Sequence, residues 1–143
     1  MSYSRLFPPE KLHKYPHLMV NDVVIWERYL ELHAKEWDSF EYDVRVGEGQ
    51  QPNTEHPEYI QTMAVALTEK RIDVVGRIRG RVWIIEVKPS AMLSAVGQLI
   101  SYQILYEERF PWAGRTELMV VTDRVGPDLE NLCKKFRIII AVV

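Results

Sequence analysis

Five polar residues within one stretch of the chain have the types and spacing that metal-dependent chemistry requires. Asp73 lies inside an apolar run, and Glu86 and Lys88 lie two residues apart near the end of the next apolar run. Gln98 and Tyr102 follow, four residues apart. Residues two apart on a strand share one face of a sheet, and residues four apart share one face of a helix. These side chains are therefore the candidates for a common site.

The sequence predicts that the two carboxylates meet. Residues 71–78 and 82–88 are apolar runs separated by a short turn that contains Gly80, which is typical of an antiparallel hairpin. In that hairpin Asp73 lies opposite Glu86, and opposite residues point to the same face with Cβ atoms about 5 Å apart. Two carboxylates at this distance repel each other. A divalent cation removes the repulsion, and oxygen ligands suit Mg²⁺ or Mn²⁺.

The other residues of the stretch could complete such a site. The Val87 carbonyl offers a further oxygen ligand, and Lys88 could hold a metal-bound water or offset the charge on a phosphate. Gln98 and Tyr102 could reach the same place from a helix packed on the sheet, although ordinary helix–sheet packing would also account for them. For either carboxylate alone, the alternative to a metal site is an ion pair with one of three cations, namely Arg71, Arg77 or Lys88.

A helix over residues 21–37 is predicted before the strands, with Asn21 or Asp22 as its N-cap. Its buried stripe recurs at three- and four-residue spacing and comprises Val23, Trp26, Leu30, His33 and Trp37. Glu27 and Glu31 lie beside the stripe, either on a solvated face or directed over the sheet towards the acidic residues. We favour Glu27 as the glutamate that joins the site.

The remaining elements follow from periodicity and from turn residues. Residues 40–46 alternate as a half-buried strand, with Phe40, Tyr42, Val44 and Val46 expected on one face. Residues 47–57 are a polar loop, and residues 58–68 fit either a helix or a strand. A helix from Ser90 or Ser94 to residue 110, a strand over 117–122, a helix over 127–135 and a strand over 137–143 complete the chain. This order predicts an α/β fold with a mixed sheet and helices on both faces.

Composition limits the class of protein. With 143 residues, 47% of them hydrophobic, and a formal charge of −2, the chain suits one soluble domain over residues 21–143, preceded by an arm at 1–20. Its apolar runs are too short to span a membrane, and no signal segment is evident, so we expect a cytoplasmic protein without a membrane partner. The single cysteine, Cys133, excludes an internal disulfide and a cysteine-rich metal centre. Bulk positive charge is absent, so any DNA contact needs locally concentrated cations.

Asp73, then Glu86-Val87-Lys88, then Gln98-x-x-x-Tyr102 resembles the motif of the PD-(D/E)xK nuclease superfamily, with Ile72 where its name has proline. The glutamine–tyrosine part is similar to the RecB-like exonuclease branch. The resemblance implies a restriction-endonuclease-like fold with an α-β-β-β-α-β core. It also implies metal-dependent hydrolysis of DNA phosphodiester bonds, in repair, recombination, or phage or mobile-element DNA processing.

By the same resemblance, the paired carboxylates would be ligands of Mg²⁺, for which Mn²⁺ would substitute. Lys88 would be the catalytic lysine, Gln98 and Tyr102 supporting residues, and Glu27 the acidic residue of the first helix. Branches of the superfamily that carry an iron–sulfur cluster are excluded, since they need four cysteines. A catalytically inactive module on the same fold, used for nucleic-acid binding or assembly, is the alternative function.

Two groups of basic residues could hold DNA phosphates, or could equally be solvated surface. They are Arg77, Arg79 and Arg81 around the hairpin turn, and Lys134, Lys135 and Arg137 near the end of the sequence. A homodimer is also plausible, because cutting a duplex requires two strand cleavages.

Overall fold

A five-stranded sheet forms the centre of the computed structural model, which describes residues 5–47, 55, 57–58 and 70–143. Its strands are β1 (Ser39–Val46), β2 (Lys70–Ile78), β3 (Arg81–Val87), β4 (Glu117–Thr122) and β5 (Ile138–Val142), in that spatial order. β1, β2 and β3 are antiparallel neighbours, whereas β3, β4 and β5 run parallel. The mixed sheet predicted from the sequence is therefore confirmed.

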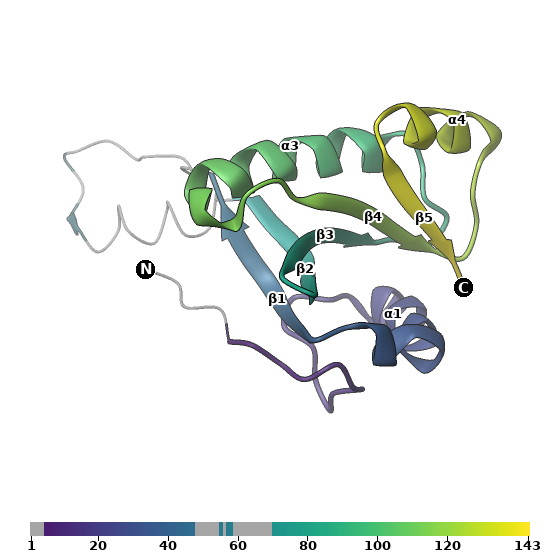
Figure 1. The fold of residues 1–143 in the computed structure, drawn as a ribbon, viewed down its shortest axis with the longest axis horizontal. Helices are drawn as coiled ribbons and strands as arrows, with labels where there is room; N and C mark the ends of the chain where they lie inside the picture. Colours follow the sequence, from purple (N-terminus) through teal and green to yellow (C-terminus); the bar gives the residue numbers. More distant parts are fainter. Residues whose placement is uncertain (1–4, 48–54, 56, 59–69) are drawn as a thin grey trace.

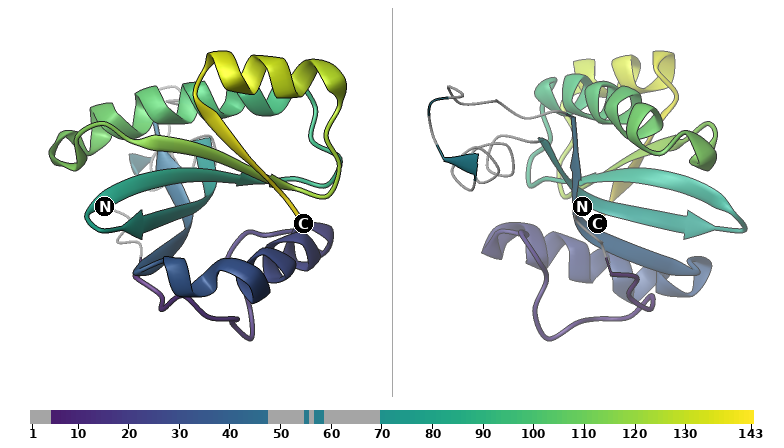
Figure 2. Two further views of the ribbon diagram at one scale, coloured as in Figure 1. Left: turned by 45° about the vertical axis from the view of Figure 1, so that its right-hand side comes forward. Right: turned by 90° about the vertical axis from the view of Figure 1, so that its left-hand side faces the viewer.

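Helices cover both faces of this sheet, as predicted (Figure 1, Figure 2). Helix α1 (Val20–His33) lies on one face, and α3 (Ser94–Arg109) and α4 (Pro127–Lys135) lie on the other. Each face has its own apolar cluster. The cluster under α1 includes Trp26, Phe40, Val74, Ile85 and Met119, and the cluster under α3 and α4 includes Ile72, Ile84, Leu99, Val120 and Leu129. The described order of elements from α1 to β4 contains the α-β-β-β-α-β core.

Helix α1 begins earlier than the sequence indicated. Its N-cap is Met19, and neither Asn21 nor Asp22 occupies that position. The Asp22 carboxylate lies in the first helical turn, where it accepts a hydrogen bond from the Met19 backbone amide at 3.3 Å. An acidic residue can satisfy an unpaired amide from inside the first turn as well as from the cap, which explains the misplaced boundary. The helix ends at His33 and continues as the short 3₁₀ turn Ala34–Glu36.

Strand β1 changes faces in its middle, so the predicted common face for its four apolar residues is wrong. Phe40 and Tyr42 pack in the cluster under α1, whereas Val44 and Val46 pack in the cluster under α3. Between them Asp43 has a φ of 55°, which breaks the strict alternation of side chains along the strand. β1 therefore contributes to both cores.

The segment before α1 also contacts the sheet. Phe7 and Phe40 exchange backbone hydrogen bonds of 2.7 and 2.9 Å, and Tyr15 is buried under α1. The predicted element at residues 58–68 lies outside the described residues except for Glu58. None of the described helices combines the length and apolar character needed to cross a bilayer. Cys133 is buried and unpaired, as expected.

Replacing Gly76 with alanine is expected to destabilise the fold by about 3 kcal/mol, the upper part of the range for overpacking a core. A Cβ at this position of β2 would lie 2.4 Å from the Trp37 ring, which cannot easily move because its Nε1 donates to the Tyr29 hydroxyl at 2.9 Å. Gly97→Ala on α3 is the control, since a Cβ there meets nothing within 4 Å and alanine favours a helix. Urea unfolding measures both, and equal stability of the two variants would contradict the packing described.

Candidate active site

The hairpin of β2 and β3 has the register that the sequence predicted. Its turn is the dipeptide Arg79-Gly80, with φ values of 50° and 80°, as a two-residue hairpin turn requires. The paired residues farthest from this turn are Val74 and Ile85, so the next residues along, Asp73 and Glu86, lie opposite each other. They stand at the end of β3 far from the turn.

Asp73 and Glu86, the carboxylate pair, lie close enough for their side chains to share a hydrogen bond. Glu86 is only 6% exposed. Burial raises the pKa of both carboxyl groups, and the neighbouring Asp73 charge raises the pKa of Glu86 further. The backbone amide of Val87 donates to Asp73 Oδ2 at 3.0 Å, which lowers the pKa of Asp73 without cancelling the effect of burial. The pair is therefore held together against its own repulsion.

Another buried glutamate on the same sheet shows how an ion pair usually offsets the free-energy cost of burying a carboxylate. Glu41 of β1 is buried but accepts a short hydrogen bond from Arg77 of β2. Arg71, the second candidate cation, lies 3.6 Å from Asp43. In the described part of the chain, neither member of the carboxylate pair forms an ion pair. The alternative explanation by a local salt bridge thus does not apply to them. A proton shared between the two carboxyl groups or a bound cation would relieve their repulsion.

Lys88 and Tyr102 lie within electrostatic range of the carboxylate pair. The Lys88 ammonium lowers the pKa of both carboxyl groups. Burial, and then the charges of Glu86 and Asp73, raise the pKa of Tyr102 to about 12, so α3 brings this hydroxyl towards the pair. Gln98 lies one turn earlier on α3, where its Oε1 is buried and has no hydrogen-bond partner. An unsatisfied buried acceptor is available to a ligand.

Two acidic residues of α1, Asp22 and Glu27, differ in what they contact or influence. The Asp22 charge raises the pKa of both Asp73 and Glu86. Glu27 instead accepts a hydrogen bond from the Tyr15 hydroxyl at 3.1 Å. From the sequence, Asp22 was considered only as a helix cap. Its place in the first turn of α1 would have indicated the site only if the angle of that helix over the sheet were known.

The basic residues expected to hold DNA lie at the other end of the sheet or on α4. The set comprised Arg77, Arg79, Arg81, Lys134 and Lys135. Arg77 pairs with Glu41, Arg81 with Glu117 and Lys134 with Glu130, whereas Arg79 and Lys135 are exposed and have no such ion pair among the described residues. Contact of these residues with DNA stays a prediction.

The donor set suits a hard divalent cation that keeps much of its water. Across the described residues, no three side chains of His, Cys, Asp or Glu gather closely enough to hold a metal ion. Mg²⁺, however, is commonly bound through one or two carboxylates, with water and substrate oxygens filling the other positions. The carboxylate pair meets that requirement, and the Val87 carbonyl between Glu86 and Lys88 stays a candidate further ligand.

Without a divalent cation, the free energy of unfolding is expected to fall as the pH rises from about 4, the usual pKa of a free carboxyl group. The pKa values of Asp73 and Glu86 are raised in the folded chain, so the folded state holds more protons than the unfolded state over this range. Thermal unfolding in EDTA at a series of pH values measures the slope. Glu86→Gln should flatten it, and an unchanged slope in that variant would contradict the proposed origin.

No protein-family model matches the chain. No curated protein matches it significantly either. Among solved structures it is similar to a protein of unknown function, AF1548, with a TM-score of 0.51 and 17% identity over 81% of this chain and 53% of the other. It is also similar to a repair endonuclease from Pyrococcus abyssi, with a TM-score of 0.46 and 16% identity over 72% of this chain and 39% of the other. The chain thus spans about half or less of these structures, and the likeness to AF1548 shows a shared fold alone.

Proposed function

We propose that this chain is a metal-dependent nuclease that hydrolyses DNA phosphodiester bonds. The observation that carries the proposal is the carboxylate pair, in which the buried Glu86 lies opposite the partly buried Asp73 and neither has an ion-paired cation among the described residues. A fold rarely retains an arrangement that lowers its stability unless the function of the protein requires that arrangement. The partly exposed side chains of Asp73 and Lys88 leave the pair accessible from one end of the sheet.

Each residue of the site has a distinct role in this proposal. Asp73 and Glu86 hold Mg²⁺, with Mn²⁺ as a substitute, and a bound ion of this kind polarises phosphate oxygens and lowers the pKa of its water. The Lys88 ammonium donates hydrogen bonds to the phosphate and offsets the negative charge that develops on it. Tyr102, whose pKa is about 12, stays protonated at neutral pH and acts as a hydrogen-bond donor. The unpaired Gln98 Oε1 accepts a hydrogen bond from substrate or water.

A panel of nucleic acids tests this proposal. Supercoiled plasmid, linear duplex, single strand, branched junction and RNA are incubated with the protein in Mg²⁺, in Mn²⁺ and in EDTA. We expect cleavage of at least one DNA form with either cation and none in EDTA. DNA binding without cleavage of any form would favour the inactive module on the same fold, and would contradict the nuclease proposal. The products also report whether cutting is internal or from an end.

The acidic residue of α1 can be identified by two matched variants. Asp22→Asn is expected to weaken Mg²⁺-dependent cleavage more than Glu27→Gln, because the Asp22 charge acts on the carboxylate pair while Glu27 binds Tyr15. A Mg²⁺ titration of the cleavage rate separates a weaker metal affinity from a slower step. A larger loss of Mg²⁺-dependent cleavage in Glu27→Gln than in Asp22→Asn would favour Glu27 as the acidic residue of the site, as the sequence pattern predicted.

A further inference from the structure

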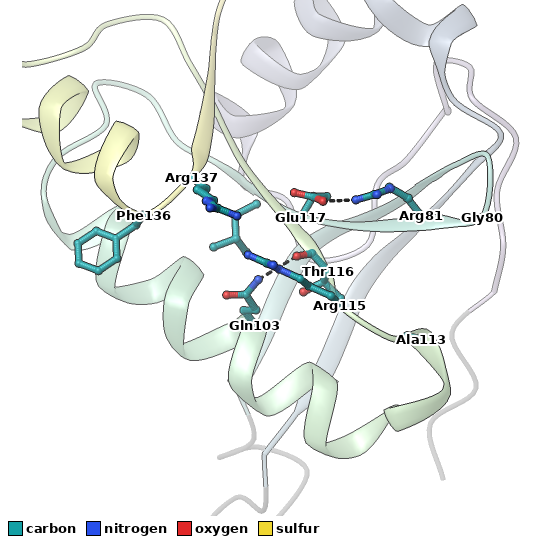
Figure 3. Close-up of a pocket in the computed structure, with 10 residues that line it drawn as sticks. Gly80, Arg81, Gln103, Ala113, Arg115, Thr116, Glu117, Phe136 and Arg137 are labelled. Carbon is teal, nitrogen blue, oxygen red and sulfur yellow. Dashed lines mark hydrogen bonds and ion pairs between the residues drawn. The ribbon is translucent and has the colours of Figure 1, made fainter.

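A polar cavity lies beside the turn of the β2–β3 hairpin (Figure 3), whereas the carboxylate pair lies at the end of the hairpin far from the turn. The cavity has a volume of about 570 Å³ and lies between the hairpin turn, the start of β4 and the segment that joins α4 to β5. Its lining includes Arg81, Arg115, Thr116, Glu117, Phe136 and Arg137. We call it the arginine cavity. The sequence pattern did not predict it, since its arginines come from three separate segments.

The arginine cavity has an excess of positive charge that the described protein does not neutralise. Arg81 forms an ion pair with Glu117 at 2.5 Å. Arg115 and Arg137 have no ion-pair or hydrogen-bond partner for their side chains among the described residues. In Figure 3 these two side chains approach the same space from different segments. Two unpaired guanidinium groups facing one polar cavity are suited to bind an anion.

The neighbouring polar groups are already satisfied within the protein, so they do not compete for those guanidinium groups. Gln103 Nε2 donates to the Thr116 carbonyl at 2.9 Å. The Thr116 amide and hydroxyl both donate to Glu107 Oε1, at 2.9 and 3.0 Å. These bonds fix the start of β4 and hence the position of the adjacent Arg115.

Arg137 has an unusual backbone conformation for a residue with a side chain. It follows the C-terminal end of α4 with a φ of 56°, a left-handed conformation that glycine usually occupies at this place. An arginine there is strained relative to glycine. Arg137 lines the arginine cavity together with the half-exposed Phe136.

We propose that the arginine cavity binds a phosphate group. The planar guanidinium fork matches two phosphate oxygens, and the exposed Phe136 ring offers a face on which a base can stack. The phosphate belongs either to a free nucleotide or to the backbone of bound DNA; only the second source rests on the proposed nuclease function. Arg81 lies five residues before Glu86 on β3, which is about 17 Å along an extended strand. One DNA strand of a duplex has about five phosphates over the same length, so a bound duplex could reach both the arginine cavity and the carboxylate pair.

Two arginine-to-glycine variants test the proposal, because the chain has a second left-handed arginine. Arg79 in the hairpin turn has a φ of 50° and does not line the cavity. Arg137→Gly and Arg79→Gly each remove one positive charge and each relieve the same kind of backbone strain. Deoxyadenosine monophosphate is titrated by calorimetry, and a fluorescein-labelled duplex by anisotropy, both in EDTA. We expect Arg137→Gly to weaken nucleotide binding by about tenfold or more, and Arg79→Gly to have a clearly smaller effect. For the duplex, which Arg79 is itself predicted to contact, the charge control is Lys35→Ala, at an exposed residue outside both proposed sites.

The two probes distinguish the sources of the phosphate. Nucleotide binding that Arg137→Gly abolishes identifies a free-nucleotide site, whereas weakened duplex binding without nucleotide binding identifies the DNA backbone. Arg115→Gln is the second variant and should reproduce the loss from a different segment. Equal effects of Arg137→Gly and of its control variant (Arg79→Gly for the nucleotide, Lys35→Ala for the duplex), or no binding of either probe by the unmodified protein, would overturn the proposal. Because EDTA removes the divalent cation, this result does not depend on whether the carboxylate pair supports cleavage.

Discussion

Lys88→Ala is expected to lower the rate of Mg²⁺-dependent DNA cleavage by about 10²–10³-fold, the usual loss when one preorganised charge stabiliser is removed. The ammonium lies within electrostatic range of both Asp73 and Glu86, at the place where a phosphate would meet them. Single-turnover cleavage of a labelled DNA at saturating Mg²⁺ measures the effect, so that a change in metal affinity does not contribute.

Lys35→Ala is the control for the loss of charge. Lys35 is exposed on the short helical turn after α1 and belongs to neither proposed site. Thermal unfolding verifies that both variants fold. A folded Lys88→Ala protein that cleaves DNA as fast as the Lys35→Ala protein would remove Lys88 from the proposed mechanism.

Glu86→Gln is expected to stabilise the metal-free protein by about 1–2 kcal/mol, while Glu41→Gln is expected to destabilise it by a similar amount. Both glutamates are buried in the same sheet. Glu86 is buried opposite another carboxylate, so folding must bury its charge or protonate it, and a neutral amide avoids that cost. Glu41 is bonded to Arg77, and its loss leaves the guanidinium without its partner. The opposite signs follow from the partners alone, since the substitution is the same.

Urea unfolding in EDTA at neutral pH measures both changes. A corresponding rise of several degrees in the melting temperature of Glu86→Gln should accompany loss of DNA cleavage, as expected when a site is retained for activity at a cost in stability. Destabilisation by Glu86→Gln would mean that Glu86 has a stabilising partner in the folded chain and that the carboxylate pair is structural.

The sequence predicted those features that depend on local patterns. Gly80 in a short turn between two apolar runs determined the hairpin and its register, and the register alone placed Asp73 opposite Glu86. Pro127 at the start of α4 and the apolar run 117–122 of β4 indicated the bounds of these elements correctly. Helices on both faces followed from the order of elements.

Features that depend on backbone strain or on tertiary assembly could not be predicted in this way. The left-handed conformation of Asp43 reverses the faces of β1, and an aspartate within an otherwise alternating run does not by itself indicate such a reversal. The action of Asp22 on the carboxylate pair depends on how α1 lies across the sheet. The arginine cavity joins Arg115 and Arg137, which are far apart in sequence and meet only because β4 and β5 are parallel neighbours.

The central claim is that Asp73 and Glu86 together hold one divalent cation. Titration with Mn²⁺, followed by electron paramagnetic resonance, tests it most directly because free and bound ions give different signals. We predict one bound Mn²⁺ per chain at neutral pH, and loss of that binding in a folded Asp73→Asn variant. Absence of binding to the unmodified protein, or undiminished binding to Asp73→Asn, would contradict the claim.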